Sequence, residues 1–395
     1  MQIYSIFFKY KSFLQKKFFF RAKYVCLQPK ILFKKRQMEH HQTDYQVSNE
    51  IIAWFQKNKR NLPWRETNDP FRIWISEIIL QQTRVQQGID YFERFVRRFP
   101  DIESLALAQE EEVLKLWQGL GYYSRARNLH EAAKLIHAKY QRVFPTKYED
   151  ILALKGVGSY TAAAIASLAW NQPYPVLDGN VYRVLGRLFA IETPYDTGKG
   201  RKIYKDLACL LMNPQKAGLH NQAIMEFGAL QCVPQNPECH QCPLINRCLG
   251  YASGNPQQFP VKQYNNKVRA RYFNYFFVVH EGHTYLSRRT KKDIWEGLFE
   301  IPLIETNHPM DLEEIVKTDD FKELFQHTGQ VSITVLEKNG VKHVLTHQIL
   351  HAKFYKIEIS EENPGLKNFL KVPLEQVDEY AVPRLIHRFF IDFLK

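Results

Sequence analysis

The chain lacks several features that would assign it to a membrane or repeat class. Among its 395 residues, no apolar run approaches the roughly 20 residues of a membrane-spanning helix. No internal repeat and no low-complexity tract follows residue 38. We therefore expect no membrane partner. A chain of this length is also expected to form more than one domain, because a single hydrophobic core rarely spans it.

Acidic residues are absent from residues 1–38. This segment carries ten Lys or Arg, so it supplies most of the formal charge of +13 and leaves only +3 for the rest of the chain. The overall charge is therefore weak evidence for a nucleic-acid partner. The segment also lacks the continuous apolar stretch of a signal peptide, and it is poor in the Arg and Ser of a usual transit peptide. We predict a disordered or non-native start, with Met38 as the initiator.

Cysteine is scarce, but four of the six cysteines are crowded into one segment. A disulfide scaffold would spread them through a smaller, secreted chain, so we expect a reducing compartment. Thiolates spaced as Cys-x6-Cys-x2-Cys-x5-Cys can ligate either zinc or an Fe–S cluster. The spacing leaves both open. The four candidate ligands are Cys232, Cys239, Cys242 and Cys248.

The hydrophobic pattern changes character along the chain. Residues 39–252 show apolar positions three and four apart, as in Val113, Leu114 and Trp117, which predicts helices. Residues 253–270 are polar and contain Gly and Pro, which indicates a linker. Residues 271–395 then show strand-like alternation, which predicts an α+β domain. The predicted fold class is thus a mainly α domain followed by an α+β domain.

Local signals divide the C-terminal domain further. Glu281-Gly282 is predicted to turn one strand into the next, and Asn339-Gly340 between two β-like runs predicts a hairpin. A helix is predicted over residues 383–394.

Two carboxylates and one turn are candidates for chemistry. Glu77 has apolar helical neighbours such as Ile73 and Trp74, which favours desolvation and a raised pKa, although periodicity alone favours an exposed Glu. Asp178 precedes a helix, where Asp is ordinarily an N-cap. Gly156 and Gly158 precede an Ala-rich helix, and such a turn suits a phosphate clamp.

Together these motifs resemble the helix–hairpin–helix DNA glycosylases, the superfamily of endonuclease III and the MutY-type adenine glycosylases. The resemblance covers residues 45–395 and rests on the Glu77 segment, the Asp178 segment, the hairpin and the cysteine spacing. In the hairpin, Lys155 replaces the family's usual Pro. The resemblance implies that the cysteines hold a 4Fe-4S cluster of structural role.

The resemblance also implies roles for individual residues. Glu77 would act as general acid, Asp178 would stabilise positive charge on the sugar, and Asn180 would order the site beside it. Trp64, Arg65 and Gln222 would line the adenine pocket. Gln82 and Tyr122 match the residues that wedge into the base stack, and Gly156 and Gly158 would contact the DNA backbone.

Two features favour the adenine glycosylases within the superfamily. Tyr160 stands where members that also cut the strand carry a Lys, so no Schiff base can form there. The chain also continues past the cysteines into a Nudix-like domain, with a W-x-G-L turn at Trp295 but without the Nudix acid cluster. Leu345, Thr346 and His347 match the family's lesion-probing loop, with Thr keeping a hydroxyl and Leu losing an aromatic surface.

The resulting expectation is a monofunctional adenine glycosylase acting on adenine opposite 8-oxoguanine or guanine in double-stranded DNA. We expect a monomer in the bacterial cytoplasm, associated with the nucleoid. Three alternatives remain open. They are a glycosylase-lyase of the endonuclease III type for damaged pyrimidines, a Nudix hydrolase, and a DNA-binding module without chemistry.

Overall fold

The computed structural model describes residues 45–263, 268–290, 292–325, 330–336, 340–362 and 364–394. The predicted extension at residues 1–38 lies outside them. By its internal contacts the chain divides into two compact units, Met1–Val96 with Ala138–Tyr264, and Arg97–His137 with Asn265–Lys395. Among the described residues, no helix has the length and apolar character needed to cross a membrane.

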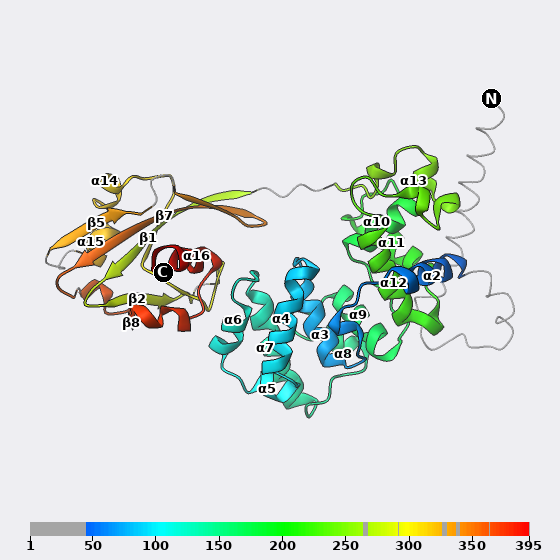
Figure 1. The fold of residues 1–395 in the computed structure, drawn as a ribbon, viewed down its shortest axis with the longest axis horizontal. Coiled ribbons are helices and arrows are strands. Elements are labelled where there is room, and N and C mark those ends of the chain that lie inside the picture. Colours follow the sequence, from blue (N-terminus) through cyan, green and yellow to red (C-terminus); the bar gives the residue numbers. More distant parts are fainter. Residues whose placement is uncertain are drawn as a thin grey trace. The chain divides into compact units, whose positions relative to one another are not determined.

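The first unit is helical throughout its described part, as predicted (Figure 1). Its core lies between α2, α9, α10, α11 and α12. The alanines of α9 are buried, and small side chains of this kind let neighbouring helices approach closely. The α-helices are α2 (Gln46–Asn58), α3 (Pro70–Leu80), α4 (Val85–Arg98), α8 (Tyr148–Leu152), α9 (Ser159–Trp170), α10 (Gly179–Leu188), α11 (Gly198–Leu211), α12 (Ala217–Leu230) and α13 (Leu249–Ala252).

Short 3-10 turns connect these helices and form much of the cysteine segment. They are η1 (Pro63–Arg65), η2 (Pro214–Lys216), η3 (Cys239–Gln241), η4 (Ile245–Arg247) and η5 (Pro256–Gln258).

The second unit joins three helices from the middle of the sequence to the C-terminal sheets. The helices are α5 (Ile102–Ala106), α6 (Glu110–Trp117) and α7 (Ser124–Lys139). The strands are β1 (Arg269–Val279), β2 (His283–Arg288), β3 (Phe299–Glu300), β4 (Leu303–Thr306), β5 (Val331–Val335), β6 (Val341–Val344), β7 (Gln348–Ile359) and β8 (Leu370–Pro373). The C-terminal part adds α14 (Leu312–Ile315), α15 (Asp319–Phe325), η6 (Pro364–Leu366), η7 (Leu374–Glu379) and α16 (Arg384–Leu394).

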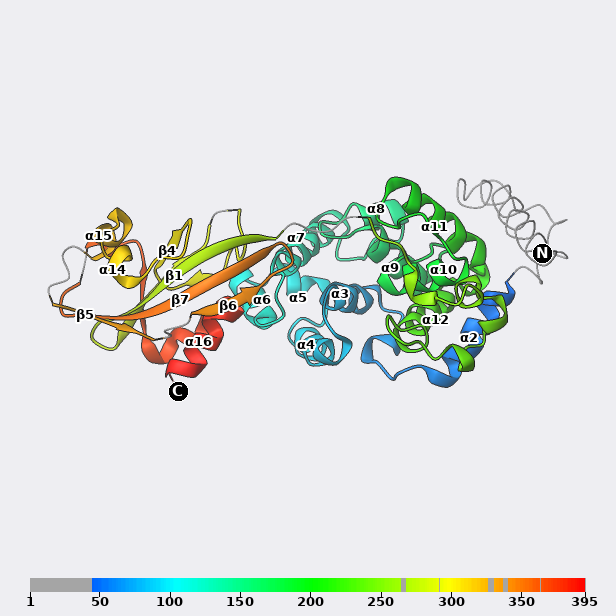
Figure 2. The ribbon, with the colours of Figure 1, turned by 90° about the horizontal axis from the view of Figure 1, so that it is seen from above.

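The larger sheet has the order β4-β1-β7-β5, with β6 also paired to β7, and the smaller sheet has the order β3-β2-β8. The two long strands β1 and β7 run parallel, with Tyr275 opposite Phe354. Both faces of β1 are buried. Phe273 and Phe277 pack in one core with α16, and Phe276 packs in another with α15. Figure 2 shows α16 on one side of the sheet and α14 and α15 on the other.

Two of the three local predictions for this part are confirmed. Glu281 and Gly282 both have positive φ, +46° and +73°, and they turn β1 into β2. The predicted C-terminal helix is α16.

The predicted hairpin at Asn339-Gly340 is wrong in its partners. β5 and β6 do not pair with each other, because both pair with the 12-residue β7, β5 near its end and β6 near its start. Gly340 does have a positive φ of +64°, as the turn signal requires, but the chain only steps along one edge of β7 there. Asn339 itself lies outside the described residues. The hairpin is made instead by β6 and β7, and its connection is 345–347.

Candidate active site

Glu77 lies in the last two turns of α3, a helix that begins with Pro70 at its first position and with Asp69 as N-cap. The Asp69 carboxylate accepts the N–H of Phe71 at 2.9 Å. Residues 73–79 of the helix are all buried, and only 7% of Glu77 is exposed. Burial raises the pKa of Glu77 to about 7, while a hydrogen bond from Tyr160 and the charge of Arg65 oppose the rise. The carboxyl group can therefore carry a proton near neutral pH.

Asp178 is the N-cap of α10, as its position just before a predicted helix indicated. One carboxylate oxygen accepts the N–H of Val181 at 2.7 Å, and the other accepts the Asn180 side-chain amide at 2.8 Å. Burial raises the pKa of Asp178, whereas these hydrogen bonds favour the charged form. The capping role fixes the carboxylate in one orientation, so capping and catalysis are compatible.

Asn180 is itself held in place. Its side-chain oxygen accepts a hydrogen bond from Arg183 at 2.8 Å. Gly228 of α12 approaches it so closely that an added Cβ would lie 2.9 Å from the Asn180 carbonyl oxygen. A side chain at Gly228 would therefore push α12 away from the Asp178 cap.

Tyr160 lies in the first turn of α9, directly after the glycine turn. Its hydroxyl donates a hydrogen bond to the sulfur of Met225 at 3.3 Å, and it lies close enough to Glu77 to lower the pKa of that carboxyl group. Burial raises the pKa of Tyr160 well above its usual range, and the charges of Glu77 and Asp178 raise it further. These mutual effects show that Glu77, Tyr160 and Asp178 lie close to one another, although they are far apart in the sequence.

One of the predicted adenine-pocket residues, Arg65, binds a carboxylate that sequence reasoning missed. Glu226 is 1% exposed, and Arg65 binds both of its oxygens at 2.9 and 2.8 Å. Arg60 binds the same two oxygens at 3.0 and 2.6 Å. These bonds outweigh burial and lower the pKa of Glu226 to about 2. Gln222 lies one helical turn before Glu226 on α12 and thus on the same face.

Trp64 shares this region with Arg65. It is buried and meets Phe92 edge to face, with 5.4 Å between ring centroids. No local motif marks Glu226 or Arg60, because their contacts join residues 161–166 positions apart. An acid on the apolar helix α12, together with Arg60 just before η1 and Arg65 at its end, was the available signal.

The glycine turn has the geometry that its sequence predicts. Gly156 has a φ of +79°, where a side chain would be strained, and Gly158 is the N-cap of α9. Leu154 and Val157 anchor the turn in the interior, while Gly156, Gly158 and Lys155 are exposed. The first N–H groups of a 12-residue helix are therefore accessible to an anion.

The two predicted wedge residues share an unusual backbone. Gln82 and Tyr122 have φ values of +56° and +49°, although neither is glycine, and both are exposed. Such strain often marks functional positions. In the second unit, the Tyr122 hydroxyl hydrogen-bonds to that of Thr346. Thr346 and His347 are exposed in the connection between β6 and β7, and Leu345 is partly buried against the core.

The four predicted ligand cysteines form no disulfides, and all are partly exposed. Burial raises the pKa of Cys242 to about 12, and the other three cysteines raise it further, so the four thiols lie near one another. Within the described ranges, no three His, Cys, Asp or Glu side chains converge as tightly as the ligands of a single metal ion.

A buried arginine secures this segment. Arg187 is 2% exposed and donates to the sulfur of Cys232 at 3.4 Å and to the Val233 carbonyl at 2.7 Å. It also donates to the Pro234 carbonyl at 2.8 Å. Motif reasoning missed Arg187, because its partners follow it by 45 positions or more.

Comparisons with known proteins agree with this arrangement. Residues 75–207 match the model of the HhH-GPD superfamily of base excision DNA repair proteins, and residues 274–391 match the model of the NUDIX domain. These matches define the class: the chain is a DNA glycosylase with a Nudix-like C-terminal domain.

Similar proteins of known name indicate which kind of DNA glycosylase the chain resembles. The adenine DNA glycosylase of Buchnera aphidicola from Schizaphis graminum is 40% identical over 67% of this chain and 76% of its own length. That of Buchnera aphidicola from Acyrthosiphon pisum is 32% identical over 89% of this chain and 99% of its own. The human adenine DNA glycosylase is 41% identical over 50% of this chain and 38% of its own. The chain belongs to the adenine DNA glycosylase family.

Proposed function

We propose that the protein is a monofunctional glycosylase that removes adenine mispaired with 8-oxoguanine or guanine in double-stranded DNA, as the first step of base excision repair. The observation that carries the proposal is the buried Glu77, whose pKa is raised to about 7 by burial and by the nearby charge of Asp178. One group can donate a proton, and the other can stabilise a cation.

The chemistry requires both groups. The adenine must first leave the base stack to reach a buried acid. Glu77 then protonates N7, which makes adenine a better leaving group, and the N-glycosidic bond breaks with positive charge developing on the sugar. Asp178 stabilises that charge, and water completes the hydrolysis. The pairing of one acid with one stabilising carboxylate parallels glycoside hydrolysis.

Neighbouring side chains position these two groups. Tyr160 lies beside Glu77 and lowers the pKa of its carboxyl group, which opposes the effect of burial. Glu226 holds Arg65 and Arg60 by four bonds, which fixes the cationic wall of the proposed adenine pocket beside Gln222 and Trp64. We propose Arg65 as a polar reader of the base, with Glu226 setting its orientation.

Recognition of the opposite base falls to the second unit in this proposal. There, Leu345, Thr346 and His347 probe the 8-oxoguanine and Tyr122 enters the base stack. In the first unit, Gln82 also enters the base stack, and Gly156 and Gly158 bind a phosphate through backbone N–H groups. The exposure of Tyr122, Thr346 and His347 supports contact with a large partner.

We also propose that Cys232, Cys239, Cys242 and Cys248 hold a 4Fe-4S cluster. The donor set fits, because burial raises the pKa values of three of the thiols and a cationic centre would favour their thiolate forms. Arg187 donates to the Cys232 sulfur, as suits a thiolate. When bound, the cluster would brace the segment after α12, and we assign no catalytic step to it.

The remaining proposals concern the whole protein. We propose a monomer in the bacterial cytoplasm, associated with the nucleoid. Its organisation would be residues 39–252 for catalysis, 253–270 as linker and 271–395 for lesion recognition.

One assay tests the proposed function. Purified protein is incubated with duplexes that contain adenine opposite 8-oxoguanine, adenine opposite guanine, or thymine glycol, and strands are resolved with and without alkali. We expect adenine excision from the first two substrates, with strand breakage only after alkali. Cleavage of the thymine glycol duplex without alkali would favour an endonuclease III-type lyase instead.

A further inference from the structure

The loop that joins β2 to β3 in the second unit is closed by two backbone hydrogen bonds, and the structure describes its residues 289–290 and 292–298. The Gly297 N–H donates to the Arg289 carbonyl at 2.8 Å, and the Arg289 N–H donates to the Leu298 carbonyl at 2.9 Å. Trp295 and Gly297 have φ values of +62° and +85°. Trp295 thus adopts a conformation that is unfavourable for a bulky residue, so its surroundings must hold the loop in place.

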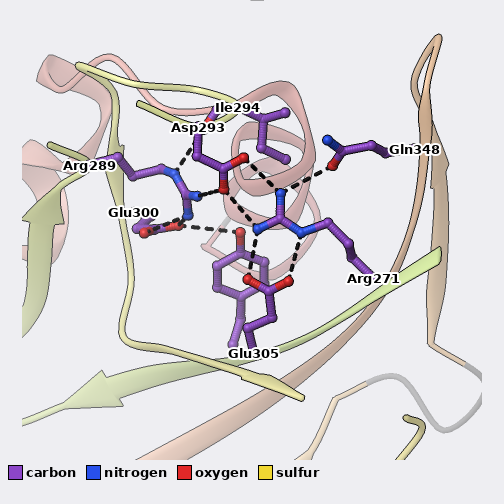
Figure 3. A network of polar contacts seen from close by, with 8 residues as sticks. Arg271, Arg289, Asp293, Ile294, Glu300, Glu305 and Gln348 are labelled. Atoms are coloured by element: carbon purple, nitrogen blue, oxygen red, sulfur yellow. Dashed lines mark hydrogen bonds and ion pairs between the residues drawn. The ribbon is translucent and has the colours of Figure 1, made fainter. Parts of the chain in front are cut away.

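A set of ion pairs formed by two largely buried arginines, Arg271 and Arg289, provides that support, and we call it the Arg271 network (Figure 3). Arg271 is 8% exposed and pairs with Asp293 of the loop at 2.7 Å and with Glu305 of β4 at 2.6 Å. Arg289 pairs with Asp293 at 3.0 Å and with Glu300 at 2.6 Å. Every charge in the network has an opposite partner, so the loop is fixed to the sheet from both of its ends.

The same loop is bound by a helix of the second unit. Arg127 of α7 donates to the Glu296 carboxylate at 2.8 Å and also to the Glu296 carbonyl. A Cβ added to Gly297 would lie 3.2 Å from Leu114 of α6 and 3.6 Å from Arg127. The side chains of Arg127 and Glu296 are only 19% and 32% exposed, so this pair is shielded from solvent.

A second connection joins the same two parts. α7 begins two residues after Tyr122, whose hydroxyl contacts Thr346. Gln348, just after the 345–347 connection, accepts a hydrogen bond from Arg271 at 3.1 Å. The loop and the connection are thus both tied to the Arg271 network, and both contact the segment that carries Tyr122.

We propose that Arg127 is a positioning residue for opposite-base discrimination: by binding Glu296 on the loop that the Arg271 network holds, it keeps Tyr122 against Thr346. This inference rests on the proposed function, in which these two side chains meet the oxidised guanine. The Arg127 guanidinium is paired with Glu296. It therefore influences discrimination by positioning Tyr122 and not by contacting the DNA itself.

Single-turnover excision rates test the inference for adenine opposite 8-oxoguanine and opposite guanine. We define the preference as the excision rate opposite 8-oxoguanine divided by the rate opposite guanine. Arg127→Gln is expected to lower this ratio by about tenfold, which is the size of effect typical when one interaction between contacting residues is lost. The rate opposite guanine is expected to stay unchanged. Arg127→Glu combined with Glu296→Arg is expected to recover most of that loss. Arg98→Gln is the matched control, because Arg98 pairs with Glu112 on the exposed surface of the same unit.

Hydrogen exchange supplies a readout that needs no substrate. Amides of residues 341–348 and 292–298 are expected to exchange faster in Arg127→Gln and to stay unchanged in Arg98→Gln. Equal loss of rate on both duplexes, or unchanged exchange in Arg127→Gln, would overturn the inference. A wild-type protein that excises adenine from neither duplex contradicts the proposed function instead, and the exchange data then still decide whether Arg127 positions the 345–347 connection.

Discussion

At the scale of single residues, the site depends on a carboxyl group that the fold keeps from solvent. Ionised Glu77 lies among buried side chains and has no cationic partner as close as those of Glu226. Raising its pKa from 4.5 to about 7 disfavours the charged form by on the order of 3 kcal/mol. The same burial that enables proton donation therefore opposes folding at neutral pH.

The substitution Glu77→Gln separates these two effects. Excision should be abolished while binding to the mismatch is retained, because the amide keeps the shape but cannot give a proton to N7. The variant should also unfold at higher denaturant than the wild type at pH 8. Below pH 4.5 both side chains are neutral, so the difference should vanish there and grow as pH rises to about 7. A variant that loses only mismatch binding would make Glu77 a structural residue.

The pH profile of excision follows from the same group. Glu77 must be protonated to act, so the single-turnover rate should fall about tenfold per pH unit above pH 7. On the acid side the rate should fall once Asp178 is protonated, since only its ionised form stabilises a cation. Duplex stability must be checked separately at each pH. A rate that stays constant to pH 9 would assign proton donation to another group.

Substitutions of Tyr160 test the prediction that the protein does not cut the DNA strand. A phenol cannot form an imine with the sugar, so borohydride should trap little wild-type protein on DNA. Tyr160→Lys should gain trapping and some strand scission, because the side chain already lies beside Asp178 and Glu77. Tyr160→Phe is the control, since it removes the hydroxyl without adding an amine. Efficient trapping of the wild type would show that a different lysine serves as nucleophile.

Glu77 and Asp178 could be named as candidates from the sequence because each stands in a contiguous segment that resembles the family. Glu226 could not, because its meaning depends on Arg60 and Arg65 more than 160 positions away. Its pKa falls to about 2 only because both arginines meet it in the fold. Charge pairs of this kind follow from tertiary structure and leave no local pattern.

At the scale of elements, local signals succeeded where one element sets its own geometry. Gly156 and Gly158 form the predicted turn before α9, and Glu281-Gly282 turns β1 into β2. The Asn339-Gly340 prediction failed because strand partners are chosen by the sheet. β7 is long enough to pair with β5 and β6 in succession. The backbone groups of the two shorter strands are therefore paired with β7, and β5 and β6 do not pair with each other.

The cysteine segment gives a prediction at this scale. Arg187→Met should lower the iron content and the broad absorbance near ~400 nm, because the Cys232 sulfur and three nearby carbonyls lose their donor. Arg247→Gln is the matched control: Arg247 lies between two of the cysteines, but it pairs with Glu50 near the surface. Full iron content in Arg187→Met, or stoichiometric zinc in a colourless active protein, would contradict the proposed role of the segment.

At the scale of the whole molecule, sequence order and structural grouping differ. The composition change near residue 253 predicts a boundary, yet residues 97–137 are grouped by their contacts with the C-terminal part. Lys115 donates to the carbonyls of Asp378 and Tyr380, and Arg288 pairs with Glu110 and Glu111 at 2.8 Å. Periodicity reveals that α6 and α7 are helices, but it does not reveal which surface they cover.

Truncation after residue 263 exposes the consequence of this grouping. Glu77, Tyr160 and Asp178 all belong to the first unit, so the shortened chain should still excise adenine opposite guanine. It should lose the preference for 8-oxoguanine, because Thr346 and its neighbours are gone. Arg127, Lys115 and Glu110 would also lose their partners, so amides of residues 110–130 should exchange faster than in the full chain. Unchanged exchange across α6 and α7 would mean that these helices are stable without the C-terminal part. Their contacts with that part would then contribute little to the stability of the second unit.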